Sequence, residues 1–364
     1  MSTASRLEKL RASFEGLGID CLLVYQPHNR RYLSGFKPAD TQIDESSGAL
    51  LIGGERAVLA TDARYQLQAK AQAKGFEVFI YPYGLYRSIG ELAASLGCRR
   101  LGYEPHAMSC ALRDKLAAEL PAGVEMVPLK DAVERLRAVK DEGEVRAIRD
   151  SLRMSEKALG MVRSRLKLGL REIDVAWDIE RLIREQGAEA VAFAPIAASG
   201  EHAAEPHAEP TNRALDKADP LILDLGARLA GYCSDMTRTF CMGRPSDRFK
   251  EIYTLVRQAQ LKAIAACRAG MKAAELDAVA RDFFTERGVA EHFAHSLGHG
   301  VGLATHERPS VSPRSEDTLE PGMVITIEPG LYLPGWGGVR LENMVVVREN
   351  GCDMLSQNEH FYEW

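Results

Sequence analysis

The chain has 364 residues, of which 46 % are hydrophobic and 27 % are charged, and its formal net charge is −5. This length predicts two domains, because one hydrophobic core rarely grows beyond about 250–300 residues. The small net charge provides no basic field for nucleic acid and no cationic face for a membrane, so we expect neither as a partner.

The amino-terminal residues and the cysteines favour a cytoplasmic protein. The first twenty residues, MSTASRLEKLRASFEGLGID, are charged throughout and lack the apolar core of a signal peptide. No apolar run reaches the roughly 20 residues that span a bilayer. The seven cysteines are scattered and form no CxxC pair, which is typical of reduced and mostly buried thiols. A catalytic thiol is the less favoured alternative.

The first part of the chain alternates apolar strands with amphipathic helices. Strands are predicted at 21–26, 48–54 and 56–61, each flanked by Gly, Asp or Pro, and a helix over 63–75 is predicted to end at Gly75. Neither a GxGxxG motif nor a P-loop occurs, so this α/β layer carries no nucleotide-binding signature.

A charged passage, LKDAVERLRAVKDEGE (129–144), separates this layer from the rest of the chain. It divides the sequence into a smaller α/β domain (1–132), a linker (133–142) and a larger domain (143–364). Beyond it, apolar residues recur at helical spacing and predict one buried helix face: Val145, Ile148, Leu152, Leu159, Val162 and Leu166. A second helix is predicted to end at Gly187.

The larger domain shows a faint internal duplication. Residues 143–240 contain two helices, a histidine-bearing segment and a strand hairpin with two aspartates. Residues 247–347 repeat this plan, with two glutamates in the hairpin. Two such halves would pack around a shared cleft.

Four acidic residues interrupt these predicted hairpins. Asp224 and Asp235 lie in the first, on either side of a turn predicted near 227–231, and Glu328 and Glu342 lie in the second. Arg340 precedes Glu342 by two residues and is predicted on the same strand face. A carboxylate inside a sheet costs several kcal/mol unless a positive group meets it.

Two explanations for these acids stay open. Each acid alone could pair with an arginine such as Arg238 or Arg340, or face solvent at a sheet edge. Four in matched hairpins, near the histidine cluster of 295–307 (HSLGHGVGLATHE), carry a summed charge that two divalent cations would neutralise. Oxygen donors with few imidazoles favour Mn²⁺ or Co²⁺, with Zn²⁺ or Fe²⁺ possible.

Five motifs in order resemble the creatinase/prolidase/aminopeptidase P branch of the pita-bread metallopeptidases: PHAEPT (206–211), LDLGARLAGYCSDMTRTF (223–240), GHGVGLATHERP (298–309), IEPGLY (327–332) and GVRLEN (338–343). The resemblance covers the chain from about residue 140 to the end and, more weakly, the segments NRRYLSGF (29–36) and TDARY (61–65). It implies an α+β fold, with a pita-bread catalytic domain of two pseudo-symmetric halves preceded by the smaller α/β domain.

The resemblance implies a dinuclear metal site with five ligands: Asp224, Asp235, His299, Glu328 and Glu342. Asp235 and Glu342 would bridge the two ions. Asp224 would complete one coordination sphere, and His299 and Glu328 the other.

The remaining site residues also take their expected roles from the resemblance. His306 would stabilise the oxyanion, and Glu328 would carry the proton to the leaving nitrogen. His207 and His295 would line the pocket for the residue after the scissile bond, and Arg340 would brace the bridging carboxylates or the substrate. His202 and Asn343 stand where the family more often has Asn and Asp, and the role of His202 is open.

The expected activity is metal-dependent hydrolysis of the peptide bond before proline, with an Xaa-Pro aminopeptidase favoured slightly over a prolidase (Xaa-Pro dipeptidase). A creatinase-type hydrolase that is not a peptidase, and an inactive binding module, are the alternatives of other classes. Both are disfavoured because all five ligand positions carry ligand-competent side chains. The family resemblance further implies a homodimer.

Overall fold

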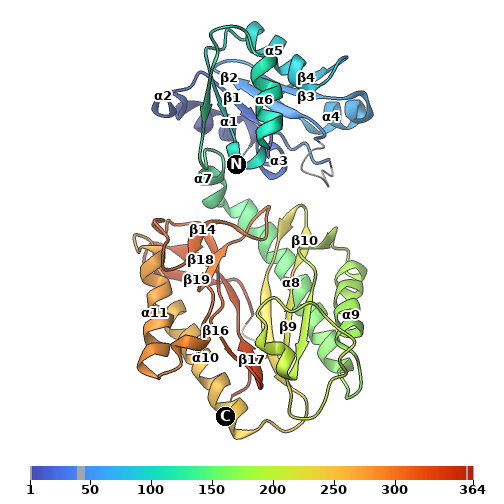
Figure 1. Ribbon diagram of the computed structural model, residues 1–364, viewed down its shortest axis with the longest axis vertical. Helices are drawn as coiled ribbons and strands as arrows, with labels where there is room; N and C mark the ends of the chain where they lie inside the picture. The colour runs from blue at the N-terminus through green and yellow to red at the C-terminus, as the bar shows by residue number, and fades with distance from the viewer. Residues whose placement is uncertain (1, 39–45, 358–359, 364) are drawn as a thin grey trace. The chain divides into compact units, whose positions relative to one another are not determined.

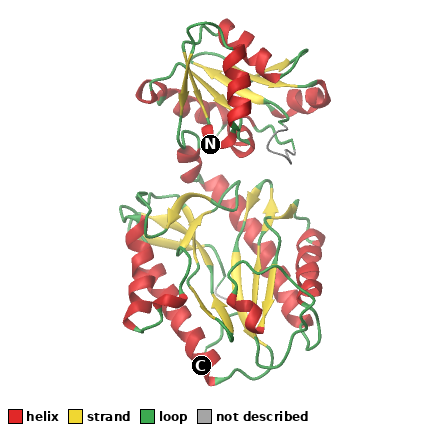
Figure 2. Ribbon diagram, viewed as in Figure 1, coloured by secondary structure: helices red, strands yellow, loops and turns green. Residues whose placement is uncertain are grey.

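The computed structural model of the protein describes residues 2–38, 46–357 and 360–363. The chain forms two compact units, Met1–Arg137 and Ala138–Trp364, and each combines helices with sheets (Figures 1 and 2). The stretch 133–142, predicted as a linker, contains helix α7 (Glu134–Ala138) and the N-cap of the following helix. No helix among the described residues combines the length and the apolar character that a membrane span requires.

The first unit is built on one mixed sheet with strand order β4-β3-β2-β1-β5-β6. Its strands are β1 (Cys21–Val24), β2 (Ala49–Gly53), β3 (Ala57–Thr61), β4 (Glu77–Ile80), β5 (Arg100–Tyr103) and β6 (Glu125–Pro128). Its other helices are α1 (Thr3–Ala12), α2 (Phe14–Leu17), α3 (Pro27–Ser34), α4 (Gln66–Gln72), α5 (Leu85–Ser95) and α6 (Cys110–Glu119). The three predicted strands are confirmed as β1, β2 and β3, which are buried along their whole length.

The helix predicted over 63–75 is wrong at both ends. A 3₁₀ turn, η1 (Ala63–Tyr65), comes first and is capped by the Asp62 side chain. Helix α4 then stops at Gln72, because Ala73 adopts a ψ of 66° that leaves the helical region, two residues before Gly75.

The second unit opens with the two predicted helices, α8 (Glu142–Arg165) and α9 (Glu172–Glu185). A capping box between Asp141 and Glu144 fixes the start of α8. Five residues of the predicted apolar face are buried within α8, but Leu166 lies outside the helix as its C-cap. Helix α9 ends before Gly187, as predicted.

Strands and two further helices complete this unit. The first half contains β7 (Ala190–Val191), β8 (Ile196–Ser199), the 3₁₀ turn η3 (Gly200–Ala204), β9 (Pro220–Leu225), β10 (Ala227–Leu229), β11 (Tyr232–Cys233) and β12 (Met236–Cys241). The second half contains α10 (Asp247–Ala266), α11 (Ala273–Glu286), β13 (Gly298–Gly300), β14 (Glu307–Val311), β15 (Val324–Ile327), β16 (Gly330–Leu333), β17 (Gly337–Arg340), β18 (Asn343–Arg348) and β19 (Gly351–Met354). In Figure 1, α8 and α9 flank the strands of one half, and α10 and α11 flank those of the other.

The duplicated plan is visible in the strand pairing. In the first half the antiparallel pair β9–β12 encloses the short hairpin β10–β11, and in the second half the pair β15–β18 encloses the hairpin β16–β17. This corrects two details of the sequence prediction. Arg340 and Glu342, expected on one strand face, do not share a strand: Arg340 ends β17, Glu342 precedes β18, and these two strands belong to different sheets. The turn expected near 227–231 contains β10, and the chain reverses at Ala230–Gly231, where both φ angles are positive.

The two halves meet between β12 and the end of β17. The Glu342 amide donates to the Thr237 carbonyl oxygen at 3.1 Å. Two residues further along β12, Thr239 Oγ1 accepts from the Arg340 amide at 3.0 Å and donates to the Arg340 carbonyl oxygen at 2.8 Å. These bonds bring the acid-bearing ends of both hairpins to one place.

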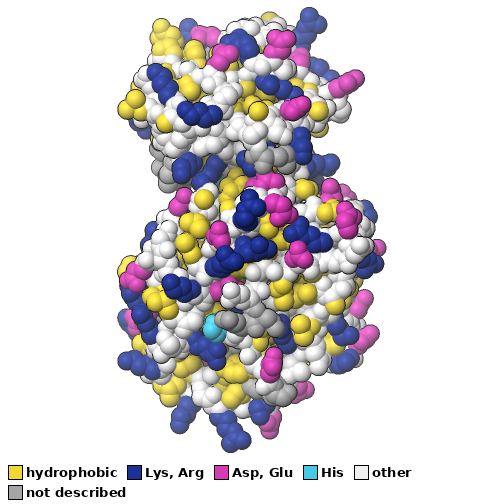
Figure 3. All heavy atoms as spheres, turned by 180° about the vertical axis from the view of Figure 1, so that it is seen from behind, with side chains coloured by type: hydrophobic (Ala, Val, Ile, Leu, Met, Phe, Trp, Pro, Cys, Tyr) yellow, Lys and Arg dark blue, Asp and Glu magenta, His cyan; other side chains and the backbone are white. Residues whose placement is uncertain are grey.

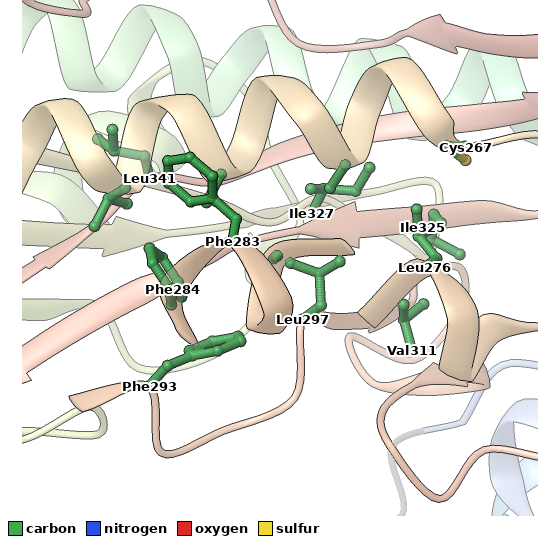
Figure 4. Packing of buried hydrophobic residues seen from close by; sticks show 14 of the residues in the cluster. Cys267, Leu276, Phe283, Phe284, Phe293, Leu297, Val311, Ile325, Ile327 and Leu341 are labelled. Atoms are coloured by element: carbon green, nitrogen blue, oxygen red, sulfur yellow. The ribbon is translucent and has the colours of Figure 1, made fainter. Parts of the chain in front are cut away.

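A cluster of buried side chains supports the second half. Phe284 of α11 points toward Phe293, whereas Phe283 points to the opposite side, toward Leu341 (Figure 4). The Phe284 and Phe293 rings meet edge to face at 5.3 Å, a favoured aromatic geometry. On the molecular face in Figure 3, acidic and basic side chains intermingle, as the small net charge suggests.

Candidate metal centre

Five candidate ligands come from strand ends that the fold brings together. Asp224 lies in β9 and His299 in β13, Asp235 and Glu342 immediately precede β12 and β18, and Glu328 follows β15. Their ligand atoms lie within 4.8 Å of one another in overlapping groups. One group is Asp224, Asp235 and Glu342, and another is His299, Glu328 and Glu342. The side chains therefore converge, although their positions in the sequence are far apart.

Burial leaves two of these oxygen atoms without a partner. Asp235 is 5 % exposed and Glu342 is 1 % exposed. Asp224 Oδ1 and Glu342 Oε1 are buried and accept no hydrogen bond within the described part of the chain. An unsatisfied buried carboxylate oxygen is costly, so its presence in two neighbouring residues indicates a site for a cation.

The acids raise one another's pKa values. Burial raises the pKa of Asp235 well above its usual range, and the charges of Glu342, Asp224 and Glu328 raise it further. The pKa of Glu342 is raised well above normal by burial and by the charges of Glu328 and Asp224, although a hydrogen bond from Thr237 opposes this. Such mutual repulsion is relieved when a cation neutralises the cluster.

His299 is oriented as a ligand would be. Its Nδ1 lies 3.1 Å from the Gly300 carbonyl oxygen, which leaves Nε2 facing Glu328 Oε1 at 3.3 Å and Asp235 Oδ2 at 3.6 Å. Burial opposes ionisation of both Glu328 and His299. Their mutual hydrogen bond outweighs it, lowering the pKa of Glu328 to about 2 and raising that of His299. A backbone carbonyl that fixes the imidazole tautomer is a common feature of metal-bound histidine.

Arginine pairing accounts for one acid of the four. Arg340 Nη2 lies 2.6 Å from Asp224 Oδ2, and the side chains are 4 % and 13 % exposed. Arg238, the arginine in β12, does not pair with these acids in this way. It donates to the carbonyl oxygens of Thr237 and Glu342 and to Asn343 Oδ1. Pairing with an arginine therefore does not account for Asp235, Glu328 and Glu342.

Four further predicted residues line a cavity of about 470 Å³ together with Asp224, Asp235, His299 and Glu328: His207, His295, His306 and Arg340. The His306 ring lies 4.2 Å from that of His299, edge to face. Burial and the neighbouring His299 lower the pKa of His306. His207 lies on the exposed loop after η3. Glu342 lies beneath the cavity and is not part of its surface.

The two departures from the family pattern have structural roles. His202 Nδ1 bonds to Glu172 Oε2 at 2.8 Å, so it is an anchored residue and does not face solvent freely. Asn343 Oδ1 accepts a hydrogen bond from Arg238, and Asn343 is not among the residues that line the cavity.

Sequence reasoning missed residues that orient the candidate ligands. Thr237 Oγ1 donates to Glu342 Oε2 at 2.8 Å, and Thr326 Oγ1 donates to Glu328 Oε1 at 3.0 Å. The Tyr332 hydroxyl lies 2.9 Å from His295 Nε2 and accepts from Arg340 Nη1 at 2.8 Å. Tyr332 ends the IEPGLY motif, which was a usable signal, whereas the threonines look like ordinary strand residues.

The donor set fits a pair of hard or borderline divalent cations. Four carboxylates and one imidazole supply mostly oxygen, and two of the oxygens lack any other partner. The two threonine hydroxyls each donate to one oxygen of Glu342 and of Glu328, as residues behind a metal ligand commonly do.

Comparisons with known proteins identify the family of the chain. The sequence model of metallopeptidase family M24 matches residues 146–349, and that of the creatinase/prolidase N-terminal domain matches residues 6–139. An uncharacterized peptidase of Bacillus subtilis is 40 % identical over 346 residues, which is 95 % of this chain and 96 % of that protein. An Xaa-Pro dipeptidase of Pyrococcus furiosus is 35 % identical over 358 residues, 97 % of this chain and 98 % of that protein.

Solved structures of related peptidases have a similar fold. An Xaa-Pro dipeptidase from Bacillus anthracis matches with a TM-score of 0.93 and 36 % identity, covering 99 % of both chains. An X-Pro aminopeptidase from Thermotoga maritima matches with a TM-score of 0.85 and 34 % identity, covering 95 % of this chain and 97 % of that one. The expected pita-bread fold with a preceding α/β domain is confirmed. The protein is an enzyme that belongs to metallopeptidase family M24, within its creatinase/prolidase/aminopeptidase P branch.

Proposed function

We propose that this metallopeptidase hydrolyses the peptide bond of Xaa-Pro dipeptides. The observation that carries the proposal is the convergence of four carboxylates and an imidazole, two of whose buried oxygens lack a partner, next to a cavity lined by three further histidines. The dipeptide is supported by the relatives from Pyrococcus furiosus and Bacillus anthracis, both named Xaa-Pro dipeptidase. The aminopeptidase favoured by sequence alone becomes the second candidate.

The residues that would hold two divalent cations are Asp224, Asp235, His299, Glu328 and Glu342, and Mn²⁺ or Co²⁺ would be the preferred metals. When bound, such ions supply a water of lowered pKa and polarise the scissile carbonyl group. Thr237 and Thr326 hold two of the carboxylates in place, and Arg340 holds Asp224.

The proposed roles of the chain in the reaction follow from its donors and acceptors. Glu328 accepts a proton from the attacking water and passes it to the proline nitrogen. His306 donates a hydrogen bond from an imidazole N–H to the oxygen on which negative charge develops. His207 and His295 line the side of the cavity that takes the residue after the scissile bond.

The cavity also suits a proline ring. Phe193 and Pro195 contribute apolar surface to its lining beside the imidazoles. A bond before proline has no amide N–H, so recognition must rest on the shape of the pyrrolidine ring and not on backbone pairing.

One observation favours the second candidate, an Xaa-Pro aminopeptidase. Arg340 is the single guanidinium group in the cavity lining, among the described residues, and it already pairs with Asp224. The carboxylate at the end of a dipeptide would therefore rely on imidazoles, whereas a longer peptide places that carboxylate outside the cavity.

A comparison of substrates tests the proposal. The metal-free protein is loaded with Mn²⁺, Co²⁺ or Zn²⁺, and kcat/KM is measured for Ala-Pro, Ala-Pro-Ala and Ala-Ala. We expect Ala-Pro to be the best substrate. A clear preference for Ala-Pro-Ala would establish the aminopeptidase, and a fully metallated protein that cleaves neither prolyl peptide would overturn both.

Assembly and location stay predictions of the resemblance and the composition: a homodimer in the cytoplasm. Sedimentation velocity of the purified protein tests the first, because a dimer has twice the 40.1 kDa mass of the chain.

A further inference from the structure

One side of the cavity is formed by a stretch of irregular chain between β8 and β9. Five consecutive residues of it line the cavity: Pro206, His207, Ala208, Glu209 and Pro210. We call residues 199–211 the substrate-side segment. Apart from η3, the described residues from 200 to 211 form no helix or strand, so something other than a backbone ladder must fix their position.

The carboxylate of Glu172 holds both ends of the substrate-side segment. At the start of the segment, Ser199 donates to Glu172 Oε1 from its amide at 2.7 Å and its hydroxyl at 2.8 Å. At the end, Thr211 donates to Oε2 from its amide at 3.0 Å and its hydroxyl at 2.7 Å. His202 Nδ1 adds a fifth contact to Oε2 at 2.8 Å. One side chain thus closes a loop of about a dozen residues.

Glu172 is well suited to this task. It is the first residue of α9 and is completely buried, and its backbone amide donates to the Arg213 carbonyl just beyond the segment. Burial opposes its ionisation, but the donors of Thr211 and Ser199 outweigh that effect and lower its pKa. The carboxylate is therefore ionised and accepts from all five groups at neutral pH.

The segment also rests directly on β17. A Cβ atom added to Gly338 would lie 2.2 Å from the Ala203 carbonyl oxygen, and one added to Gly337 would lie 2.5 Å from that of Gly200. Only glycine permits this approach. Further along the same strand, Arg340 Nη1 donates to the Pro206 carbonyl oxygen at 3.0 Å while its Nη2 holds Asp224. The segment is consequently tied to the candidate metal ligands through one arginine.

We propose that Glu172 is a positioning residue that sets the placement of the substrate-side segment, and through it the affinity for the prolyl part of the substrate. His202 then serves as one of three tethers to Glu172. This inference rests on the proposed function for the identity of the substrate, but the tethering itself does not depend on it.

The test compares two substitutions in helix α9. Glu172→Gln replaces one acceptor oxygen by an N–H donor that faces other donors, whereas Glu185→Gln makes the same change at a 55 % exposed side chain that pairs with Arg181. For Glu172→Gln we expect the KM for Ala-Pro to rise about tenfold or more while kcat stays within about threefold. Metal content should remain that of the wild type, and Glu185→Gln should change neither constant.

A second pair of variants tests the inference even if Glu172→Gln does not fold. His202→Ala removes one tether and should raise KM about threefold, whereas His202→Asn, whose amide can donate to the same oxygen, should restore it. A purely structural role would lower the amount of folded enzyme without changing KM in the folded fraction. An unchanged KM in both folded Glu172→Gln and His202→Ala therefore overturns the inference.

Amide hydrogen exchange of residues 200–211 supplies a readout that needs no activity. Exchange there should be faster in Glu172→Gln and His202→Ala than in Glu185→Gln, and equal rates in all three would refute the tethering. If the wild type cleaves no prolyl peptide, the proposed function fails, while the exchange rates still decide whether Glu172 holds the segment.

Discussion

Asp235 is the residue whose charge is hardest to explain without a cation. It is 5 % exposed, and its pKa is raised well above normal by burial and by three neighbouring carboxylates. We expect Asp235→Asn to abolish turnover and to release bound metal, as measured by activity assay and atomic emission. Asp353→Asn, at an exposed strand residue, serves as the control. A variant with full activity and two bound ions would refute the ligand assignment.

His306 offers a separate test, because its proposed role concerns the transition state. Removing one oxyanion donor costs roughly 10²–10³ in kcat. We expect that loss in His306→Ala, with little change in KM and no loss of metal. His292→Ala, outside the cavity lining, should behave as the wild type in the same steady-state assay. An effect on KM alone would contradict the role.

At this scale the sequence predicted those residues whose motifs are contiguous. His299 and His306 stand in one glycine-rich stretch, and the acids interrupt apolar strands. Glu172 escaped notice because its partner is distant: it binds Thr211, 39 positions away. Tyr332 stands in the IEPGLY motif, but its contact with His295, 37 positions away, is not apparent from that motif. A lone glutamate at the start of a helix looks like an ordinary first-turn acid.

At the scale of elements, a buried ion pair fixes the end of the loop between β13 and β14. Lys140 Nζ lies 2.9 Å from Glu307 Oε1, with side-chain exposures of 1 % and 5 %, and Glu307 directly follows His306. Removing one member of a buried pair costs about 3–5 kcal/mol, because the other charge is left uncompensated. We expect Lys140→Met to lose stability of that order in urea unfolding.

The matched control for Lys140→Met is Glu142→Gln, which breaks the exposed pair with Arg348. Such surface pairs contribute about 0–1 kcal/mol. A loss for Lys140→Met no larger than the loss for this control would show that the buried pair does not support the loop.

In the first unit, a pH-dependent pair joins the turn η2 (Pro105–Ala107) to α7. His106 Nε2 lies 3.1 Å from Glu134 Oε1. The hydrogen bond with Glu134 raises the pKa of His106, although burial opposes it. Burial opposes ionisation of Glu134, but the bonds from His106 and Asn29 lower its pKa to about 2.

The directions of these two pKa shifts define the pH range in which the pair stabilises the folded protein. The His106 contribution is complete below its unfolded pKa of about 6.5 and is lost as pH rises through the raised value. The Glu134 contribution is complete above about pH 4.5 and is lost as pH falls toward the lowered value. The melting temperature of the wild type should therefore exceed that of His106→Gln more at about pH 5.5 than at about pH 8. An equal difference at both pH values would contradict this.

The sequence predicted several elements of each unit but not every boundary. The period of α8 and the apolar runs of β1, β2 and β3 were sufficient to place them. The division between β17 and β18 was not visible, because Leu341 at the crossing is as buried as the strand residues and maintains the apolar pattern. Alternation reports burial, not the sheet to which a strand belongs.

For the whole molecule, the cluster of carboxylates couples folding to metal. A ligand that binds only the folded state stabilises it by about 2.7 kcal/mol per site at one hundred times its Kd. We expect Mn²⁺ to raise the melting temperature of the EDTA-treated protein in calorimetry. Asp235→Asn should not respond, and an equal response in both proteins would place the binding elsewhere.

The duplicated plan of the second unit was predicted from sequence as a similarity of order, and the strand pairing confirms it. The contacts between the two halves could not be predicted from the sequence. The bond between Glu342 and Thr237 links positions 105 apart, and no local pattern specifies such a contact.

The distribution of the candidate ligands over both halves has a consequence for the order of synthesis. Asp224 and Asp235 leave the ribosome before Glu342 is made, an interval of the order of ten seconds at roughly 5–20 residues per second. During that time the first hairpin carries its acids with neither the matching glutamates nor Arg340. The nascent first half must therefore keep these carboxylates hydrated, and the cleft closes only after the second hairpin has been made.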